Sequence, residues 1–413
     1  MASSTGRRWR RSSVSARSAV SAVSALLIGT CWLGCLSVAL GACVAPDSST
    51  SPPPATMTTS ATITWTPVGL PAGHSPVTLT AYQGGVLVGT RASQSPEAPE
   101  STGAPGLVAL TSSGPIALPV IAASPYGEEA TWLSIEATRE GGLVAVGGAR
   151  GGAHSNVRWS VWRGDGSGLR EQEQVFSTFG GWGAGEQLGV IPTDAGPMLL
   201  GSWESKGAGL DADIWLPVGR EWIRQDPQGT PLASTSTLLV GPRAGAARGP
   251  AAVVVGSVVD LGDGVAQRPA AWVSRDGNDG WESVDMPGSR GEALNVGCGT
   301  RDCLVVGVSA DRLAAWRLTG NRSDAVVGLP DFTIADGASM PPPQAIEDGW
   351  LVVAPSDQRT RAMVVTASGV VREVPPPPGK ITTIRTFQGT WYAVTTDPGG
   401  RTALWSAAVT LQR

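Results

Sequence analysis

The chain has 413 residues, of which 55 are Gly and 32 are Pro, and only 15% are charged. This composition excludes a coiled coil, a bundle of long charged helices and an acidic disordered chain. It favours short β-strands separated by Gly and Pro turns, and the length allows one large β domain or two smaller ones.

Residues 1–42 have the composition of an export signal. The first 17 residues hold five Arg and no acidic residue, and residues 18–42 hold no charge. A basic segment followed by an apolar one is typical of a signal peptide. Because the apolar segment is long enough to span a bilayer, an uncleaved anchor helix is the alternative. The pairs Arg7-Arg8 and Arg10-Arg11 leave general secretion and twin-arginine export both open.

Leu40-Gly41-Ala42-Cys43 ends this segment and resembles the lipobox of bacterial lipoproteins. The resemblance implies that Cys43 is acylated and becomes the N-terminus after cleavage. The protein would then be held at the cell membrane, on its extracytoplasmic face, stably if it carries two acyl chains. Ser, Thr and Pro dominate residues 43–60, which predicts a disordered tether. We assign residues 61–413 to the folded domain.

The rest of the chain is acidic on balance. Without residues 1–42 it holds 25 basic and 34 acidic residues, a net charge of −9. A nucleic-acid-binding protein usually has a basic stripe, so the charge argues against that class. We expect a monomer whose partners are the membrane, through its lipid, and a protein or glycan of the cell envelope.

Two cysteines remain in the predicted folded domain. They are Cys298 and Cys303, separated by four residues, Gly-Thr-Arg-Asp, that favour a turn. Two strands joined by a tight turn would bring the Cβ atoms within disulfide range. Metal binding is the alternative, but it needs further ligands, and the chain has only two His. We therefore predict a disulfide, no metal site and no cofactor.

A short apolar signature recurs along the chain. It consists of a turn, a run of Val and Leu, and then Gly or another small residue, and its seven copies follow at intervals of 41 to 58 residues. A second apolar run, often with Trp, follows each copy, and shorter β-prone runs flank the two. Four short strands in each unit are the signature of a β-propeller blade. The copies are Gly84–Gly89, Gly141–Gly147, Gly196–Gly201, Pro250–Gly256, Asp302–Gly307, Gly349–Ala354 and Gly389–Thr395.

We therefore predict an all-β fold, a β-propeller of seven four-stranded blades. The seventh unit has almost no residues left for its fourth strand, whereas residues 61–70 contain a β-prone run with Trp65 ahead of the first unit. We expect this N-terminal run to complete the last blade and close the ring, because an open array would leave an unpaired strand edge. Two stacked β-sandwiches, or a ring of six or eight blades, are the alternatives.

The segment Ser274-Arg-Asp276-Gly-Asn-Asp-Gly280-Trp281 is similar to the Asp-box, the Ser-x-Asp-x-Gly-x-Thr-Trp turn of sialidase-type propellers. The resemblance covers this turn and a fainter copy at Trp162–Gly168, and it implies the fold. In that family the motif is a structural turn remote from the active face. We find no match to the sialidase arginine cluster, Tyr–Glu pair and acid Asp, so the resemblance implies no activity.

A propeller usually binds ligands where the connections between second and third strands emerge. These connections are predicted to be long in the first four units, at residues 90–105, 148–156, 202–212 and 257–269. A Trp beside acidic residues suits a sugar or a basic peptide. Trp203 follows the expected end of a strand, so its ring would project from the loop, and a core Trp wedged between blades is the alternative. The candidate ligand-binding residues are Trp203, Glu204, Asp211, Asp260 and Asp263.

The sequence favours a non-enzymatic, membrane-anchored cell-envelope lipoprotein whose propeller binds a protein or a glycan. The alternatives are a sialidase-like glycoside hydrolase or lyase whose site matches no motif, and a purely scaffolding envelope protein. We identify no catalytic residue, because nucleophile-elbow, P-loop and zinc-protease motifs are missing. Carboxylates and arginines converging at the mouth of the ring would favour an enzyme, and an apolar or mixed patch across the long loops would favour binding.

Overall fold

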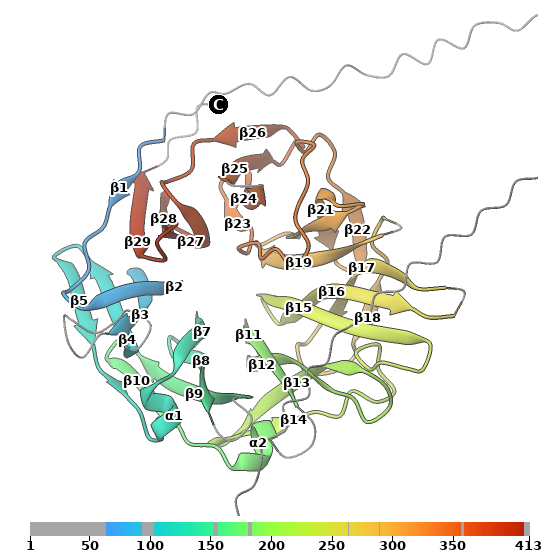
Figure 1. Cartoon of the computed structure of the whole chain (residues 1–413), viewed down its shortest axis with the longest axis horizontal. Helices are drawn as coiled ribbons and strands as arrows, with labels where there is room; N and C mark the ends of the chain where they lie inside the picture. The colour runs from blue at the N-terminus through green and yellow to red at the C-terminus, as the bar shows by residue number, and fades with distance from the viewer. Residues whose placement is uncertain are drawn as a thin grey trace, which may run out of the picture. The chain divides into compact units, whose positions relative to one another are not determined.

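The computed structural model describes residues 63–92, 103–151, 156–180, 184–262, 264–288, 290–356 and 359–408. Within these ranges the strands form seven sheets that stand in a ring around a central axis, as Figure 1 shows. The fold is the predicted seven-bladed β-propeller with antiparallel four-stranded blades. The predicted signal and tether, together with Cys43 and Asp263, lie outside the ranges that the structure describes.

Blades 1 to 3 contain the N-terminal strands and two short helices. Blade 1 consists of β2 (His74–Tyr82), β3 (Gly85–Ala92), β4 (Ala104–Thr111) and β5 (Gly114–Leu118). Blade 2 consists of β7 (Thr131–Ala137), β8 (Leu143–Gly151), β9 (Asn156–Asp165) and β10 (Gly168–Gln172), and the short strand β6 (Val120–Ile121) adds to β10 in parallel. Blade 3 consists of β11 (Gly185–Thr193), β12 (Gly196–Glu204), β13 (Leu210–Val218) and β14 (Glu221–Arg224). The helices α1 (Pro125–Glu128) and α2 (Phe176–Gly180) lie in the connections that lead to β7 and β11.

Blades 4 to 7 complete the ring. Blade 4 consists of β15 (Leu238–Arg248), β16 (Ala251–Asp260), β17 (Ala266–Ser274) and β18 (Glu282–Val284). Blade 5 consists of β19 (Gly291–Cys298), β20 (Cys303–Ser309), β21 (Arg312–Thr319) and β22 (Arg322–Ala325). Blade 6 consists of β23 (Gln344–Ile346), β24 (Gly349–Ser356), β25 (Arg359–Thr366) and β26 (Val371–Val374). Blade 7 consists of β27 (Lys380–Phe387), β28 (Thr390–Thr396), β29 (Thr402–Ala408) and, from the other end of the chain, β1 (Thr66–Pro67).

The N-terminal strand closes the ring, which confirms the prediction for residues 61–70. β1 pairs antiparallel with β29, with Thr66 opposite Ser406, and the backbone N–H of Val68 donates to the Leu404 carbonyl at 2.8 Å. The indole N–H of Trp65 donates to the carbonyl of Pro375 at 2.9 Å. Blade 7 is therefore built from both ends of the described chain.

The apolar signature is the second strand of every blade. Such a strand lies inside its sheet and packs between two neighbouring blades, so Val and Leu are buried on both of its faces. At two positions, the Gly that ends a copy of the apolar signature is required for steric reasons. A Cβ atom on Gly256 would lie 2.0 Å from the Gly241 carbonyl oxygen, and one on Gly307 would lie 2.1 Å from the Glu292 carbonyl oxygen. The innermost strand passes too close there for any larger residue.

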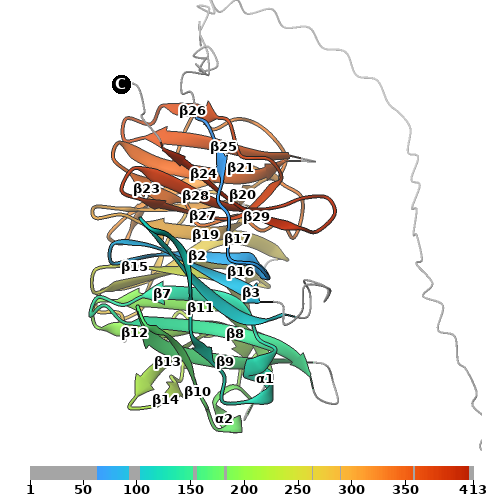
Figure 2. The same ribbon diagram turned by 90° about the vertical axis from the view of Figure 1, so that its left-hand side faces the viewer.

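The ring has two faces, which Figure 2 shows from the side. We call "upper" the face with the connections between second and third strands and between blades. We call "lower" the face with the hairpins that join first to second and third to fourth strands.

The long upper loops predicted in blades 2 to 4 are wrong in part, because much of those ranges is strand. β8 and β9 stay paired out to Gly151 and Asn156, and β16 and β17 stay paired out to Asp260 and Ala266. The upper rim of these blades is therefore raised by long hairpins and not by loops.

Cys298 and Cys303 form the predicted disulfide. They are paired residues at the lower ends of β19 and β20, with Cα atoms 4.0 Å apart. The turn-forming residues between them thus connect two adjacent strands.

Replacing both cysteines by Ser is expected to lower the free energy of unfolding by only about 2 kcal/mol, because the closed loop is short in the chain-entropy account. Urea unfolding of the oxidised protein and of the double variant measures this difference. A double variant that no longer folds would show that the disulfide stabilises more of the structure than the β19–β20 hairpin.

Candidate functional site in the central channel

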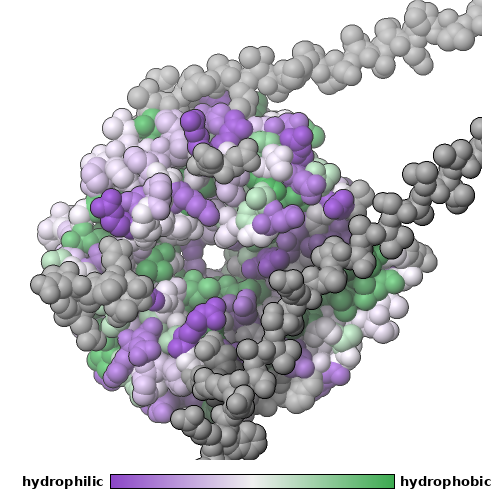
Figure 3. Space-filling view, in the orientation of Figure 1, coloured by the Kyte–Doolittle hydropathy of each residue, from purple (hydrophilic) through white to green (hydrophobic). Residues whose placement is uncertain are grey.

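The innermost strands of all seven blades surround a channel of about 650 Å³. Figure 3 shows it as an opening at the centre of the ring, bordered by apolar surface on the side of β7 and β11. Its volume falls in the range of sites that take small molecules or side chains of a partner. It is the candidate functional site because every blade contributes to its wall.

A ring of extra residues forms the wall of the channel. In six of the seven innermost strands described, the pairing with the second strand shifts by one residue, a β-bulge, and the unpaired residue lines the channel. A bulge turns a side chain away from the regular ladder, and bulges are common beside binding sites. In blade 6, where β23 is short, Pro341–Pro343 take this place. The bulge ring consists of Val77, Leu133, Leu188, Arg243, Leu294 and Thr382.

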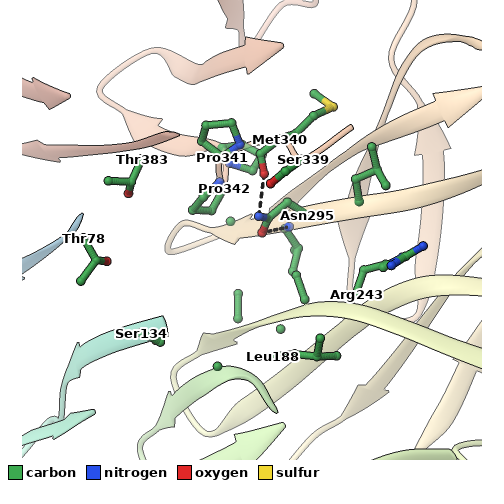
Figure 4. A pocket seen from close by; sticks show the side chains of 18 of the residues that line it. Thr78, Ser134, Leu188, Arg243, Asn295, Ser339, Met340, Pro341, Pro342 and Thr383 are labelled. Atoms are coloured by element: carbon green, nitrogen blue, oxygen red, sulfur yellow. Dashed lines mark hydrogen bonds between the residues drawn. The ribbon is translucent and has the colours of Figure 1, made fainter. Parts of the chain in front are cut away.

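A second layer of small polar side chains follows the bulge ring. Thr78, Ser134, Asn295 and Thr383 each follow a bulge residue, and Figure 4 shows them around the same cavity. The amide nitrogen of Asn295 donates to the carbonyl of Met340 at 2.8 Å, which fixes the segment that leads into β23. The channel therefore passes from a ring that is aliphatic at four of its six positions to a layer of hydroxyl and amide groups.

Two ion pairs join blades across the channel wall. Arg385 of blade 7 donates to the carboxylate of Glu136 in blade 2 at 2.5 Å and to the carbonyl of Leu79 in blade 1 at 3.1 Å. Arg243 of blade 4 donates to Glu292 of blade 5 at 2.5 Å. Burial raises the pKa of Glu136, although the charge and hydrogen bond of Arg385 act in the opposite direction. Each pair is electrically neutral when the carboxylate is ionised.

The predicted projection of Trp203 is wrong. The strand continues past Gly201 to Glu204, and Trp203 pairs with Asp211 on the next strand. Its side chain is 2% exposed, and its ring packs edge-on against Trp215 with ring centres 5.2 Å apart. Trp203 therefore belongs to the core between blades, the alternative that the sequence left open.

The other candidates do not converge on one site. Glu204 and Asp260 are exposed at the upper ends of different blades. Asp211 is buried, and its carboxylate accepts a hydrogen bond from the backbone N–H of Ser234 at 2.6 Å, so it holds the segment between blades 3 and 4 in place.

Sequence reasoning missed a buried ion pair beside them. Asp213 is fully buried and accepts two hydrogen bonds from the guanidinium of Arg224, at 2.7 and 2.8 Å. Burial raises the pKa of Asp213 to about 6, against the opposing effect of Arg224 and with smaller contributions from Asp211 and Asp226. The sequence shows only that Asp213 follows Asp211 by two residues, and this spacing does not indicate a buried ion pair with Arg224.

The Asp213→Asn variant is expected to gain stability relative to the wild type as the pH rises from about 4 to 6. In this window the folded protein holds a proton on Asp213 that the unfolded chain releases, so the wild type loses stability with rising pH. The pKa of Asp213 differs by about two units between the folded and unfolded states, which corresponds to a relative gain in the free energy of unfolding on the order of 3 kcal/mol. Urea unfolding at several pH values measures it, and parallel pH profiles for the two proteins would contradict the raised pKa.

The turn Ser274–Trp281 lies on the lower face, between β17 and β18, far from the upper end of the channel. The Asp276 carboxylate accepts backbone N–H groups of Asn278 and Asp279 at 3.1 and 3.3 Å, and these bonds lower its pKa. Ser274 donates to the same carboxylate at 3.0 Å. The bonds are local to the turn, which gives these residues a structural part.

The described ranges contain no cluster of three or more His, Cys, Asp and Glu side chains able to hold a metal ion. They also contain no helix that is both long and apolar enough to cross a membrane.

Comparison with known proteins finds similarity in structure and none in sequence. No model of a known family matches the chain, and no curated protein matches its sequence. Similar solved structures include the β-propeller domain of the Trilobed protease from Pyrococcus furiosus, with 8% identity, a TM-score of 0.49, and coverage of 81% of this chain and 93% of that one. Pyrococcus horikoshii acylaminoacyl peptidase has 10% identity and a TM-score of 0.46, over 81% of this chain and 51% of its own. Trypanosoma rangeli sialidase has 11% identity and a TM-score of 0.42, over 67% of this chain and 53% of its own. The chain spans about half the length of these two enzymes, and the likeness concerns the propeller fold.

Proposed function

We propose that this protein is a lipid-anchored extracytoplasmic binding protein without enzymatic activity, and that it captures a polypeptide of the cell envelope at the channel. In this proposal the signal at residues 1–42 is removed, Cys43 carries the lipid, and residues 43–60 tether a monomeric propeller. The lipobox resemblance supports the anchor. The disulfide between Cys298 and Cys303 supports export, since such bonds persist mainly in oxidising compartments.

The bulge ring carries the proposal for binding. It places one unpaired residue from each of six blades around a cavity on a rigid scaffold, and the side chain of Leu133 is 40% exposed there. A rim that is aliphatic at four of its six positions, above a layer of hydroxyl and amide groups, is the mixed lining that binding sites have. Regular hydrogen bonding between the first and second strands does not require these extra residues. Their presence therefore favours a role in binding a partner.

The character of the lining favours a polypeptide over a glycan. Among the described residues that line the channel, Trp132 is the only aromatic one, and its ring is buried. A glycan site would usually offer an exposed aromatic face to the sugar ring. Leu133, Leu188 and the partly exposed Pro342 instead suit aliphatic side chains of a partner.

A glycoside hydrolase is the second candidate, and one observation favours it. Two carboxylates and two arginines do converge on the channel, and the pKa of Glu136 is raised, as in many catalytic acids. Against it, each carboxylate is held by an arginine of another blade, whereas a hydrolase needs a pair of carboxyl groups flanking the substrate. Turnover of aryl glycosides that Glu136→Gln abolishes would decide for the enzyme.

The binding proposal is tested by capture from the organism's own envelope fraction with the purified lipoprotein. Leu133→Arg is expected to reduce the capture of a specific partner about tenfold or more, the equivalent of 1.4 kcal/mol, because it replaces an aliphatic contact of the bulge ring with a charge. Val218→Arg is the matched control, since Val218 is exposed on the lower face. Equal capture by wild type, Leu133→Arg and Val218→Arg would contradict a partner site in the channel.

A further inference from the structure

We propose that the upper face, with the bulge ring at its centre, points away from the membrane. The inference rests on the proposed lipid anchor at Cys43. It defines which surface of the propeller is offered to a partner in the envelope.

The direction of the first described residues carries the argument. β29 runs from the upper connection at residues 397–401 to the lower face at Ala408. β1 is antiparallel to it, with Thr66 opposite Ser406, and Val68 reaches the Leu404 carbonyl. The chain therefore rises from the lower to the upper face between Ile63 and Leu70.

The lower end of this segment is fixed. Ile63 is buried in the core between blades 6 and 7, and the ring of Trp65 lies against Trp391 with ring centres 6.5 Å apart. Ile63, where the described part of the chain begins, thus lies at the lower edge of blade 7.

The length of the chain between Cys43 and Ile63 bears on whether the upper face could turn to the membrane instead. About twenty residues separate Cys43 from Ile63. Twenty residues span about 70 Å at full extension, but a flexible chain of that length has a mean end-to-end distance of only about 25 Å. A strand of eight residues is about 26 Å long, so turning the upper face to the membrane would use the whole of that mean distance to cross the height of a blade, which favours the lower face at the membrane.

The face so presented has the apolar groups that a polypeptide partner needs. Leu133 lies at the channel, Phe176 lies in α2, and Leu261 and Val265 flank the upper connection of blade 4, all of them exposed on the upper face. Only Leu133 lines the channel, and the other three side chains lie outside its lining. On this orientation none of them faces lipid.

Energy transfer to lipid tests the orientation. The purified full lipoprotein is reconstituted into phosphatidylcholine vesicles that contain an acceptor dye on a lipid headgroup, and a donor dye is attached to one added cysteine. Val370→Cys marks the lower face of blade 6, Val218→Cys the lower face of blade 3, and Val265→Cys the upper face of blade 4. These three side chains are 49%, 63% and 83% exposed. The native cysteines of the propeller do not compete, because they are joined in a disulfide.

Transfer is expected to be highest from position 370, intermediate from 218 and lowest from 265, with at least about a twofold difference between the extremes. Insertion of forty Gly and Ser residues after Pro54 should reduce that difference, because a longer chain lets the domain turn more freely. Equal or reversed transfer in protein that is bound to the vesicles would overturn the orientation and leave the anchor intact. Protein that stays off the vesicles would overturn the anchor and this inference with it.

Discussion

Deletion of residues 61–70 is expected to prevent formation of a stable ring. The segment contributes the outer strand of blade 7, the buried side chain of Ile63 and the Trp65 indole, which donates to Pro375. Loss of a buried large aliphatic side chain such as Ile63 costs about 2–5 kcal/mol, and the partly buried Trp65 and the strand pairing add to this loss, so the total is a large part of the stability of a typical domain. The deletion also exposes the edge of β29 to pairing with other chains. We expect aggregated protein, or a melting temperature lower by more than about 10 °C.

Deletion of residues 44–58 is the matched control and is expected to leave the melting temperature unchanged. It removes a longer piece of chain from the same end but leaves Ile63, Trp65 and β1 in place. Size-exclusion chromatography and thermal unfolding of both deletions make the comparison. Similar melting temperatures for the two would show that blade 7 is stable with three strands.

The Arg385→Met variant is expected to lose about 2–3 kcal/mol of stability at pH 8, because it leaves the largely buried Glu136 carboxylate, 21% exposed, without its partner. The loss should be smaller at pH 5. Without Arg385 the pKa of Glu136, already raised by burial, rises further. The folded protein then holds a proton that the unfolded chain releases above about pH 4.3, so stability falls as the pH increases from there through the folded value.

Two variants control for this result. Arg243→Met breaks the other channel ion pair, in which the arginine is half-exposed, so we expect a loss of at most about 1 kcal/mol. The double variant Glu136→Leu/Arg385→Met removes both charges and should recover most of the stability lost by Arg385→Met. Urea unfolding at pH 5 and pH 8 measures all three. A loss in Arg385→Met that does not change with pH would mean that Glu136 stays solvated in the folded protein.

The blades were predictable from sequence because their second strands are buried on both faces, which leaves a continuous run of Val and Leu that recurs with every blade. The closure by residues 61–70 followed from counting strands, since the seventh unit was short of one. The disulfide followed from two cysteines on either side of a turn. Each of these features depends on residues close together in the chain or on a repeat.

The channel was not predictable, because its features depend on residues from different blades. Arg385 and Glu136 are 249 positions apart, and no local pattern connects them. The bulge ring depends on a shift of one residue in the pairing of each strand, which leaves no composition signal at Leu133 or Leu188. Trp203 was misplaced because Gly201 suggested a strand end, whereas the ladder with β13 continues to Glu204. A Gly that makes room for a neighbouring strand and a Gly that starts a loop are identical in sequence.

The pairing of Thr66 with Ser406 sets the earliest time at which the protein can finish folding. The two residues are 340 positions apart, so β1 has no partner until nearly all of the chain has been made. At about 5–20 residues per second, synthesis of that stretch takes roughly 17–70 s. During this time β1 and the apolar side chains around Trp65 stay unpaired. A chain that ends before β29 therefore carries β1 without the strand with which it pairs, and its ring cannot close.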